Sequence, residues 1–401
     1  MSQTYFQKGF NLKSVVSPIL ARNYHSQVVD RVREMRSSVR AGELSLKLAR
    51  EFGFCYGVDR AVEYAYETRE KFPDRRIFLS GEIIHNPDVN SRIEAMGIRL
   101  LKDVATPAER YAEVGAADVV ILPAFGVTVA EMEDLRARGC VLVDTTCGSV
   151  LNVWKNVHIY AREGFTAVIH GKHYHEETKA TASQALTHPH GRYLCVRDRG
   201  EADVVCSFIR GDIGREEVLS RFEHAMSPRF DPDTDLARIG LANQTTMLMS
   251  ESLEIQEMLR SAMRDRYGDA EIRSRFRAFD TICSATQDRQ DAVLRMLGEG
   301  GLDLMLVIGG YNSSNTTALA RICSERLPTF HINGPDCLEG ATVRHRPVGS
   351  HGEVRTAGWL PGGRVTVGIT AGASTPNNVV GEVIERVLAR RDHVVADLVP
   401  V

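Results

Sequence analysis

The sequence predicts an α/β protein of three lobes, and three observations support this prediction. Short apolar runs alternate with amphipathic helical segments along most of the chain. A chain of 401 residues is more typical of two or three lobes than of one domain. Three of the eight cysteines, Cys55, Cys147 and Cys283, each stand where a strand-like run gives way to a helical one.

Five short apolar runs are interpreted as buried strands. They cover residues 119–122, 141–143, 167–170, 304–308 and 365–369. Helical spacing follows Cys55 and recurs near the end of the chain, with apolar side chains three and four residues apart. These positions are Val58, Ala61, Val62 and Ala65, then Val380, Val383, Ile384 and Val387. Alternating strands and helices of this kind indicate parallel sheets that are covered by helices.

The expected domain boundaries fall near the second and third of these cysteines. We expect an N-terminal arm at 1–44, lobes at 45–147, 148–279 and 280–391, and a tail at 392–401. The first strand of the first lobe could instead join the sheet of the third. A charged, proline-bearing stretch near 210–235 is interpreted as a surface insertion of the second lobe.

The N-terminal arm permits two interpretations. Its first acidic residue is Asp30, as in an organellar presequence. Its aromatic residues, Tyr5, Phe6, Phe10 and Tyr24, favour an arm that packs on the body of the protein.

Composition excludes several classes of protein. Hydrophobic residues are 43% and charged residues 25% of the chain, as in an ordinary globular protein. A formal net charge of −3 argues against nucleic acid as a partner. No apolar stretch approaches the roughly 18 residues of a membrane span, and no secretory signal is visible. We therefore expect a reducing, cytoplasmic location and no disulfides.

Three thiolates at the ends of distant strands suit a metal centre where three lobes meet. In an iron–sulfur cube, three cysteine ligands leave one iron free to bind a substrate. Four other cysteines lie in apolar strands or helices and are interpreted as buried thiols. These are Cys140, Cys195, Cys206 and Cys323, while Cys337 has no assigned role.

Two loops resemble cradles for a phosphate or diphosphate. Ser313, Ser314 and Asn315 follow a predicted strand and begin a helix, where one such residue would suffice as a cap. The string 370–376, which includes Ser374, repeats this pattern on another strand. Free backbone N–H groups and the helix dipole would bind an anion there. No P-loop spacing occurs, which disfavours ATP.

Titratable groups follow two further strands. His175 and Glu177 lie in a string that does not match the H-E-x-x-H metal motif, so we expect anion binding by His175 and proton donation by Glu177. His85 is placed at a strand end, where structural and functional roles are about equally expected. Thr245 lies in an Asn-Gln-Thr-Thr string that could position a proton.

These strings together resemble one enzyme family. They are Gly-Phe-Cys-Tyr-Gly-Val-Asp-Arg-Ala, Glu-Ile-Ile-His-Asn-Pro, Asp-Thr-Thr-Cys, Asn-Gln-Thr-Thr, Thr-Ile-Cys-Ser-Ala-Thr-Gln-Asp-Arg-Gln, Asn-Ser-Ser-Asn and Thr-Ala-Gly-Ala-Ser. In this order, over residues 45–390, the chain resembles the 4-hydroxy-3-methylbut-2-enyl diphosphate reductases (IspH, also called LytB), and in particular their cyanobacterial and plant-type branch.

The resemblance implies a trefoil-like arrangement of three α/β lobes around a central [4Fe–4S] cluster. It implies that Cys55, Cys147 and Cys283 are the three cluster ligands. The implied reaction is a two-electron reductive dehydroxylation that yields isopentenyl and dimethylallyl diphosphate, the last step of the non-mevalonate isoprenoid pathway. Ferredoxin or flavodoxin is the implied electron donor, with a plastid location if the source is a plant or alga.

The resemblance also assigns roles to the polar residues. The diphosphate would bind to the histidines and to the polar side chains of the two cradles, namely His85, His175, Ser313, Ser314, Asn315 and Ser374. Glu177 would deliver the proton, with help from Thr245.

Two departures from the family pattern stand out. Phe125 occupies the position of a site histidine that many members carry, and Gly148-Ser149 follows Cys147 where proline is usual.

Three alternatives remain open at this point. A hydro-lyase with a similar open-iron cluster would consume no net electrons. A non-enzymatic iron–sulfur sensor has little support, because the sequence has no evident helix-turn-helix or basic stripe. The third alternative is a structural zinc protein, which would lack the absorbance of an iron–sulfur cluster at about 400 nm.

Overall fold

The computed structural model describes residues 4–102, 104, 106–279 and 281–401. The chain divides into two compact units. The first unit comprises the chain up to Lys8, Phe72–Ile83 and Gly97–Cys283, and the second comprises Gly9–Lys71, Ile84–Met96 and Ser284–Val401. Residues 1–3 of the predicted arm and residue 280, the expected start of the third lobe, lie outside the described residues.

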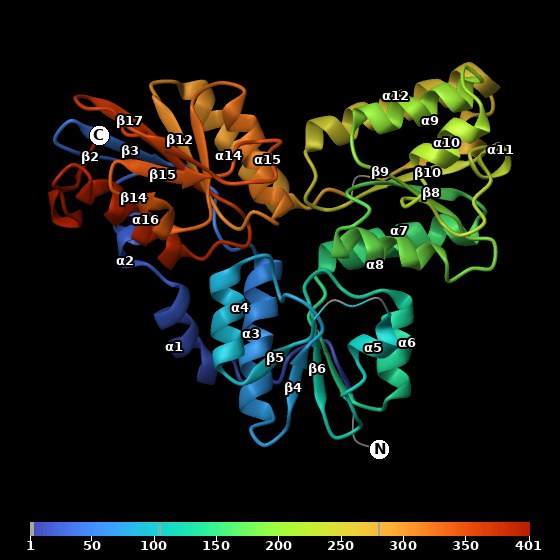
Figure 1. The fold of residues 1–401 in the computed structure, drawn as a ribbon, viewed down its shortest axis with the longest axis horizontal. Coiled ribbons are helices and arrows are strands. Elements are labelled where there is room, and N and C mark those ends of the chain that lie inside the picture. Colours follow the sequence, from blue (N-terminus) through green and yellow to red (C-terminus); the bar gives the residue numbers. More distant parts are fainter. Residues whose placement is uncertain (1–3, 103, 105, 280) are drawn as a thin grey trace. The chain divides into compact units, whose positions relative to one another are not determined.

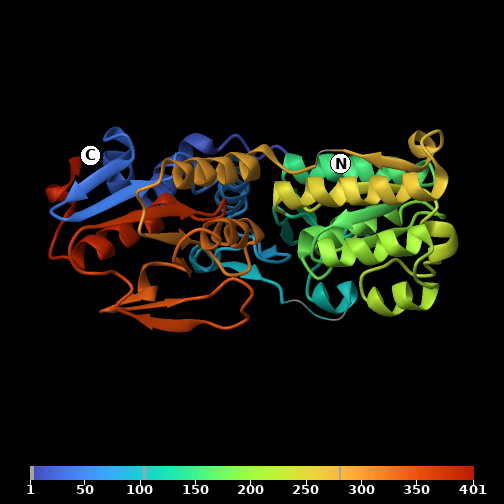
Figure 2. The same ribbon diagram turned by 90° about the horizontal axis from the view of Figure 1, so that it is seen from above.

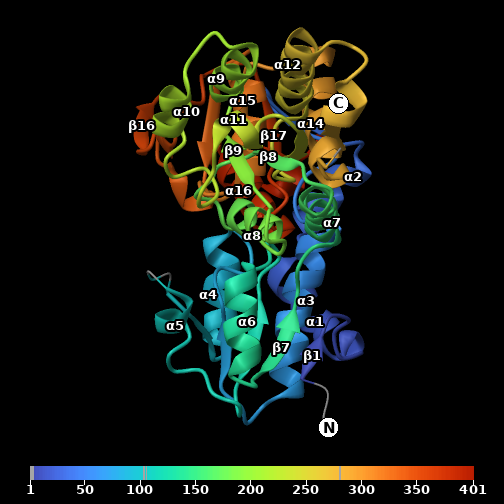
Figure 3. The same cartoon turned by 90° about the vertical axis from the view of Figure 1, so that its right-hand side faces the viewer.

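The first unit contains a five-stranded parallel sheet. Its order is β1 (Tyr5–Phe6), β7 (Val141–Asp144), β6 (Val119–Leu122), β4 (Ile77–Leu79) and β5 (Ile98–Leu100). The strands predicted at 119–122 and 141–143 are confirmed as β6 and β7. Figure 3 shows β1 beside β7, where Tyr5 pairs with Leu142, so the start of the arm is part of this sheet. Two short helices, α5 (Pro107–Arg110) and α6 (Val129–Ala137), connect its strands.

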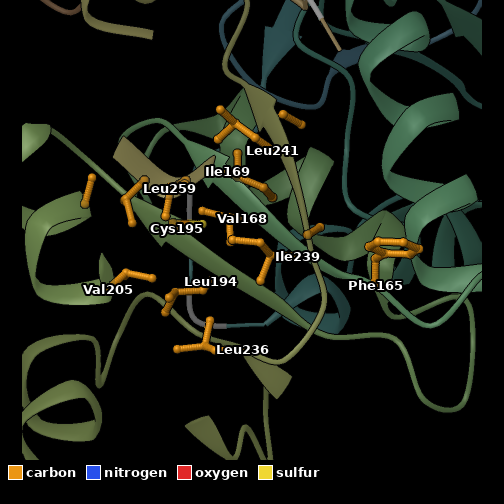
Figure 4. Packing of buried hydrophobic residues seen from close by; sticks show 14 of the residues in the cluster. Phe165, Val168, Ile169, Leu194, Cys195, Val205, Leu236, Ile239, Leu241 and Leu259 are labelled. Carbon is orange, nitrogen blue, oxygen red and sulfur yellow. The ribbon is translucent and has the colours of Figure 1, made fainter. Parts of the chain in front are cut away.

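The first unit also contains a four-stranded parallel sheet. Its order is β11 (Phe276–Ala278), β10 (Ile239–Asn243), β8 (Thr166–His170) and β9 (Tyr193–Val196). Helices α7 (Gly148–Arg162) and α8 (Glu176–Ala185) cover one face, and α9 (Arg199–Arg210) and α12 (Met249–Tyr267) cover the other (Figure 1). Phe165, Ile169, Leu194, Ile239 and Leu259 belong to the apolar core around this sheet (Figure 4).

The charged stretch near 210–235 contains two short helices, α10 (Arg215–Arg221) and α11 (Pro232–Asp235). Val218, Phe222 and Phe230 from this stretch are buried in the same core. The stretch is therefore packed against the domain through its few apolar side chains, which the surrounding charges obscure in the sequence. A further short helix, α13 (Ile272–Arg275), leads into β11.

The second unit contains a six-stranded sheet. Its order is β13 (Thr329–Ile332), β12 (Leu304–Ile308), β17 (Val365–Ala371), β3 (Leu44–Leu48), β2 (Ser38–Ala41) and β18 (Val399–Pro400). The first four strands are parallel, whereas β2 and β18 pair antiparallel at one edge. The strand β3 thus joins the strands of the expected third lobe, while the expected domain boundaries stay a prediction.

Seven helices are described in the second unit. They are α1 (Lys13–Tyr24), α2 (Gln27–Glu34), α3 (Tyr56–Lys71), α4 (Pro87–Ala95), α14 (Ser284–Glu299), α15 (Ser314–Ser324) and α16 (Asn377–Ala389). Val29 and Val32 of α2 share a core with Val380 and Ile384 of α16. Figure 1 shows the two helices close together. The arm therefore packs on the body of the protein, as its aromatic residues predicted.

A small antiparallel sheet completes the second unit. It consists of β14 (Leu338–Glu339), β15 (Thr342–His345) and β16 (Val354–Ala357), and Figure 2 shows its hairpin in orange and red. A one-turn helix at Pro335–Cys337 precedes β14, and another at Val395–Asp397 precedes β18. The sequence analysis did not predict these strands.

Two parallel sheets and one mainly parallel sheet, each with its own helices, confirm the predicted fold class of an α/β protein with several small domains. In parallel sheets the loops that follow neighbouring strands meet at one edge. The loops after β8, β10 and β11 therefore share one edge in the first unit. The loops after β12, β17 and β3 share another in the second unit.

Candidate active site

The three candidate ligand cysteines stand directly before long helices. Cys147 is the N-cap residue of α7, Cys55 precedes α3, and Cys283 precedes α14. The predicted change from strand-like to helical sequence at each cysteine is confirmed. A helix N-terminus stabilises negative charge and so favours the thiolate form of a cysteine.

Burial separates these three cysteines from the others. The three are partly exposed, whereas the remaining five are buried, as predicted for four of them. Burial raises the pKa of Cys140 and Cys206 to about 11 and that of Cys195 and Cys323 to about 12. Those four thiols stay protonated at neutral pH and Cys337 is buried as well, so Cys55, Cys147 and Cys283 are the three cysteines that are open to a ligand on their surface.

Hydrogen bonds fix the loop that carries Cys147. Its backbone N–H donates to Ala124 O over 3.0 Å, which joins this loop to the one that follows β6. The Asp144 carboxylate accepts the N–H of Thr146 at 2.9 Å. Gly148, where the family pattern has proline, opens α7, and no atom lies within 4 Å of the position a Cβ would take there. The absence of proline therefore leaves the helix start intact.

His175 is the N-cap residue of α8 and is only 6% exposed. Its Nδ1 accepts the backbone N–H of Glu177 at 3.1 Å. An accepting Nδ1 bears no proton, so the neutral ring carries its hydrogen on Nε2. His175 is thus held in the tautomer that can donate from Nε2 to an anionic ligand.

Glu177 and Thr245 lie on one hydrogen-bonded path with Cys283. The Glu177 side chain is 1% exposed, and its Oε1 accepts the backbone N–H of Thr245 at 2.6 Å. The carbonyl of Thr245 in turn accepts the N–H of Cys283 at 3.3 Å. The carboxyl group is therefore positioned through Oε1 by the backbone of the Thr245 loop.

Gln244, which the sequence analysis named only as part of the Asn-Gln-Thr-Thr string, joins two loops of this site. Its Oε1 accepts from Lys172 N and from Thr178 Oγ1, both at 3.2 Å. Its Nε2 donates to Thr246 Oγ1 at 2.9 Å. A fully buried amide with these partners holds the loop of His175 and Glu177 against the loop of Thr245.

Phe125 lies beside His175. The ring centroids are 5.7 Å apart with an interplanar angle of 80°, an edge-to-face contact. Trp154 of α7 supports the same loop, since a Cβ on Gly126 would lie 2.4 Å from its ring. Gly126 also has a φ of +76°, which favours glycine at this position.

In the second unit, the helix α15 begins in the first predicted cradle. Ser313 is its N-cap residue, and its Oγ accepts the N–H of Thr316 at 3.3 Å. Asn315 is 2% exposed, and its Oδ1 accepts the N–H of Ala373 at 2.9 Å. Its buried Nδ2 has no hydrogen-bond partner among the described residues. An unsatisfied buried donor beside a helix N-terminus fits a site for an anionic ligand.

Ser374 and His85 adjoin this cradle. The Ser374 hydroxyl donates to the carbonyl oxygen of His85 at 3.2 Å. A Cβ on Gly310 would lie 2.5 Å from the same carbonyl oxygen, so glycine permits the close approach of the His85 backbone. His85 is not at a strand end as predicted: it lies in the loop between β4 and α4, because Asn86 caps α4 immediately after it.

The loop of Cys55 belongs to the same edge of the six-stranded sheet. The Cys55 N–H donates to Ala373 O at 3.2 Å. Arg289 of α14, 5% exposed, donates to the carbonyl of Gly53 at 2.7 Å and to that of Phe54 at 3.0 Å. This guanidinium, which the sequence analysis also named only as part of a string, fixes the backbone next to a candidate ligand.

The fold and these loops define a class: an α/β enzyme with three partly exposed cysteines at helix starts and neutral donors for an anionic substrate. The family model described as LytB protein matches residues 46–388, and the chain belongs to this family. The family uses an iron–sulfur cluster.

Curated relatives include two cyanobacterial proteins named 4-hydroxy-3-methylbut-2-enyl diphosphate reductase. The one from Gloeobacter violaceus is 48% identical over 391 residues, which cover 96% of this chain and 92% of the relative. The one from a Synechococcus strain is 48% identical over 389 residues, which cover 96% and 94%. The family predicted from the sequence is confirmed.

Two solved structures have a similar fold. The E-1-hydroxy-2-methyl-but-2-enyl-4-diphosphate reductase of Plasmodium falciparum has a TM-score of 0.64 at 21% identity, covering 87% of this chain and 88% of that one. A structure of (E)-4-hydroxy-3-methyl-but-2-enyl diphosphate reductase has a TM-score of 0.50 at 28% identity, covering 85% and 98%. Within the described part of the chain, no helix combines the length and apolar character that crossing a membrane requires.

Proposed function

We propose that this protein reduces (E)-4-hydroxy-3-methylbut-2-enyl diphosphate to isopentenyl and dimethylallyl diphosphate, the last step of the non-mevalonate isoprenoid pathway. The substrate takes up two electrons and two protons, its C–O bond to the hydroxyl breaks, and water leaves. Membership of the LytB family supports this reaction. The observation that carries it is the path from Glu177 through Thr245 to Cys283, which links an acid to the loop of a cluster ligand.

The proposed cofactor is a [4Fe–4S] cluster with Cys55, Cys147 and Cys283 as its three protein ligands. When bound, the cluster would supply the electrons and a Lewis-acidic iron for the substrate oxygen. The helix starts at α3, α7 and α14 would stabilise the negative charge of the thiolates. We propose ferredoxin or flavodoxin as the electron donor.

The diphosphate would bind to neutral donors. His175 would donate from Nε2, the nitrogen that its N-cap contact leaves protonated. Ser313, Ser314 and Asn315 would donate at the start of α15, together with His85 and Ser374. Neutral donors bind the anion without a magnesium clamp and allow the product to leave.

Glu177 would deliver the proton to the departing hydroxyl. Its Oε1 is held by the Thr245 backbone, so the orientation of Oε2 is fixed before substrate binds. Burial of the carboxyl group excludes water that would otherwise take up the proton. Thr245 would act as the positioning residue for this acid.

The experiment combines iron and sulfide quantification with turnover under anaerobic conditions. The wild-type protein should hold about four irons and consume two electrons per substrate from reduced ferredoxin, whereas a hydro-lyase would consume none. The variants Cys55→Ser, Cys147→Ser and Cys283→Ser should lose iron and activity. The matched control Cys323→Ser, at a buried thiol, should keep both. Turnover without net consumption of reductant would overturn the proposal.

The cellular location stays a prediction. The cytoplasmic location expected from the sequence, and the plastid location expected for a plant or alga, need fractionation of the source cells with an antibody against the protein.

A further inference from the structure

Two histidines face each other on the surface of the first unit, outside the candidate active site. His158 lies in the last part of α7, and His188 follows the end of α8. Their Nε2 atoms are 3.3 Å apart, and their ring centroids are 4.5 Å apart with an interplanar angle of 54°. The two helices pack against each other along their length, so this pair belongs to a fixed part of the fold.

The neighbouring threonine fixes the tautomer of His158. The Thr187 hydroxyl donates its single hydrogen to Gln184 O at 2.7 Å. It can therefore only accept from His158 Nδ1, which lies 3.2 Å away. The proton of the neutral imidazole is thus on Nδ1, and the lone pair of Nε2 points towards His188. Metal-binding histidines are commonly oriented by this kind of contact on the second ring nitrogen.

The separation of the two Nε2 atoms matches a shared metal ion. Zinc–nitrogen bonds of about 2.0–2.1 Å at a tetrahedral angle place two nitrogens roughly 3.3–3.4 Å apart. The observed 3.3 Å agrees with that value, and without a metal ion the same arrangement lets His188 Nε2 donate a hydrogen bond to the unprotonated Nε2 of His158.

The charges around the pair permit binding at neutral pH. Burial lowers the pKa of His158, and His188 and Arg162 lower it further, so its ring is neutral and able to coordinate. Arg162 is the nearby cation, and its guanidinium lies 3.3 Å from the Glu163 carboxylate, which also pairs with Arg277.

We propose that His158 and His188 form a surface site for a divalent transition metal such as Zn²⁺ or Ni²⁺, with water in the remaining positions. Imidazole nitrogen suits these ions, whereas Mg²⁺ and Ca²⁺ prefer oxygen ligands. Because α7 starts after Cys147 and α8 starts after His175, a metal ion here would link the far ends of two helices that begin at the candidate active site.

The test is a titration of the untagged, cluster-loaded protein with Zn²⁺ or Ni²⁺ against a chromophoric chelator, under anaerobic conditions at pH 7.5. The wild-type protein should bind one ion. His158→Asn and His188→Asn should each weaken binding at least tenfold, and Thr187→Val should weaken it by about tenfold. The control His224→Asn, at an exposed histidine of the same unit, should bind as the wild type does.

Thermal unfolding without metal checks that the variants fold. All should unfold near the wild-type temperature, because the altered groups lie at the surface, and saturating Zn²⁺ should raise this temperature only where the pair is intact. Unchanged affinity in both histidine variants would overturn the proposal. An equal loss of affinity in His224→Asn would also overturn it, because binding would then not depend on this pair.

Discussion

The ring centroids of Phe125 and His175 lie 5.7 Å apart at an interplanar angle of 80°, an edge-to-face contact. An aromatic side chain there cannot donate a hydrogen bond to substrate. It instead restrains the ring of His175 from one side, while Glu177 N–H holds its Nδ1. Phe125 therefore orients His175 by packing and adds no hydrogen-bond donor of its own.

The variant Phe125→Ala removes that restraint. An edge-to-face contact is worth about 0.5–1.5 kcal/mol, so KM for the diphosphate substrate should rise roughly two- to twelvefold with a smaller change in kcat. Steady-state kinetics with a chemical reductant measure this split. Phe125→His should restore a low KM by adding a donor, and an unchanged KM in Phe125→Ala would show that the contact does not position His175.

The variant Glu177→Gln removes the transferable proton but keeps an oxygen that can accept the Thr245 N–H. Turnover should fall by about 10²-fold or more, because an amide cannot act as a general acid. Iron content and substrate binding should remain near wild type. The control is Glu217→Gln, at an exposed carboxylate of α10, which should turn over substrate at the wild-type rate. Equal activity in the two variants would exclude Glu177 from the proton path.

Arg289 fixes the Cys55 loop by donating to two successive carbonyl groups, of Gly53 and Phe54. Lysine keeps the charge but cannot reach both carbonyls in the same plane. The variant Arg289→Lys should lose one such hydrogen bond to a charged group, which contributes about 1.5–3 kcal/mol. Release of iron to a chelator should therefore become roughly tenfold faster or more. Arg295→Lys, at an exposed arginine of the same helix, should release iron at the wild-type rate. Identical rates in both variants would contradict this role.

His331 lies behind the first cradle, and its Nε2 donates to Gly309 O at 3.0 Å. Burial, with a smaller effect of the nearby Arg346, lowers the pKa of this histidine to about 4. The unfolded chain, with an ordinary pKa near 6.5, therefore binds the proton first as pH falls. The contribution of neutral His331 to the free energy of unfolding is fully present above about pH 6.5. It is lost progressively as the pH falls towards about 4.

When the pH is lowered from 8 to 5.5, protonation of this histidine in the unfolded chain should reduce the free energy of unfolding by about 1.4 kcal/mol. Urea unfolding of the wild type and of His331→Asn at both pH values measures the effect. The wild type should lose more stability than the variant by this amount. Parallel losses would show that the pKa of His331 is not depressed in the folded protein.

The parallel sheets were predictable from the sequence because their strands are continuous apolar runs between helices. The runs at 119–122 and 304–308 became β6 and β12 with the same bounds. The edge strands β2 and β18 and the small antiparallel sheet were not predicted. Their sequences alternate between apolar and polar residues or contain charged residues, so they have no continuous apolar run. They form strands because they pair with a neighbouring strand.

The candidate site was predictable as a set of residue types but not as a set of contacts. Cysteines at helix starts and serines at a cradle follow from local sequence. Gln244 and Arg289 lie in strings that the sequence analysis quoted, but their contacts could not be predicted, because these depend on which distant loops lie side by side. Gln244 contacts Lys172 and Thr178, and Arg289 contacts Gly53. His85 was misplaced because its strand, β4, ends earlier than the apolar run suggests.

The pairing of Tyr5 and Phe6 with Leu142 and Val143 also constrains the order of events during synthesis. These two aromatic residues leave the ribosome long before the strand that receives them exists. Tyr5 and Phe6 cannot pair until β7 has been synthesised. Until they pair with it, the edge of β7 is exposed to strands of other chains. Tyr5 and Phe6 are therefore translated before β7 but can reach their place only after it, and a slow arrival would favour aggregation of nascent chains.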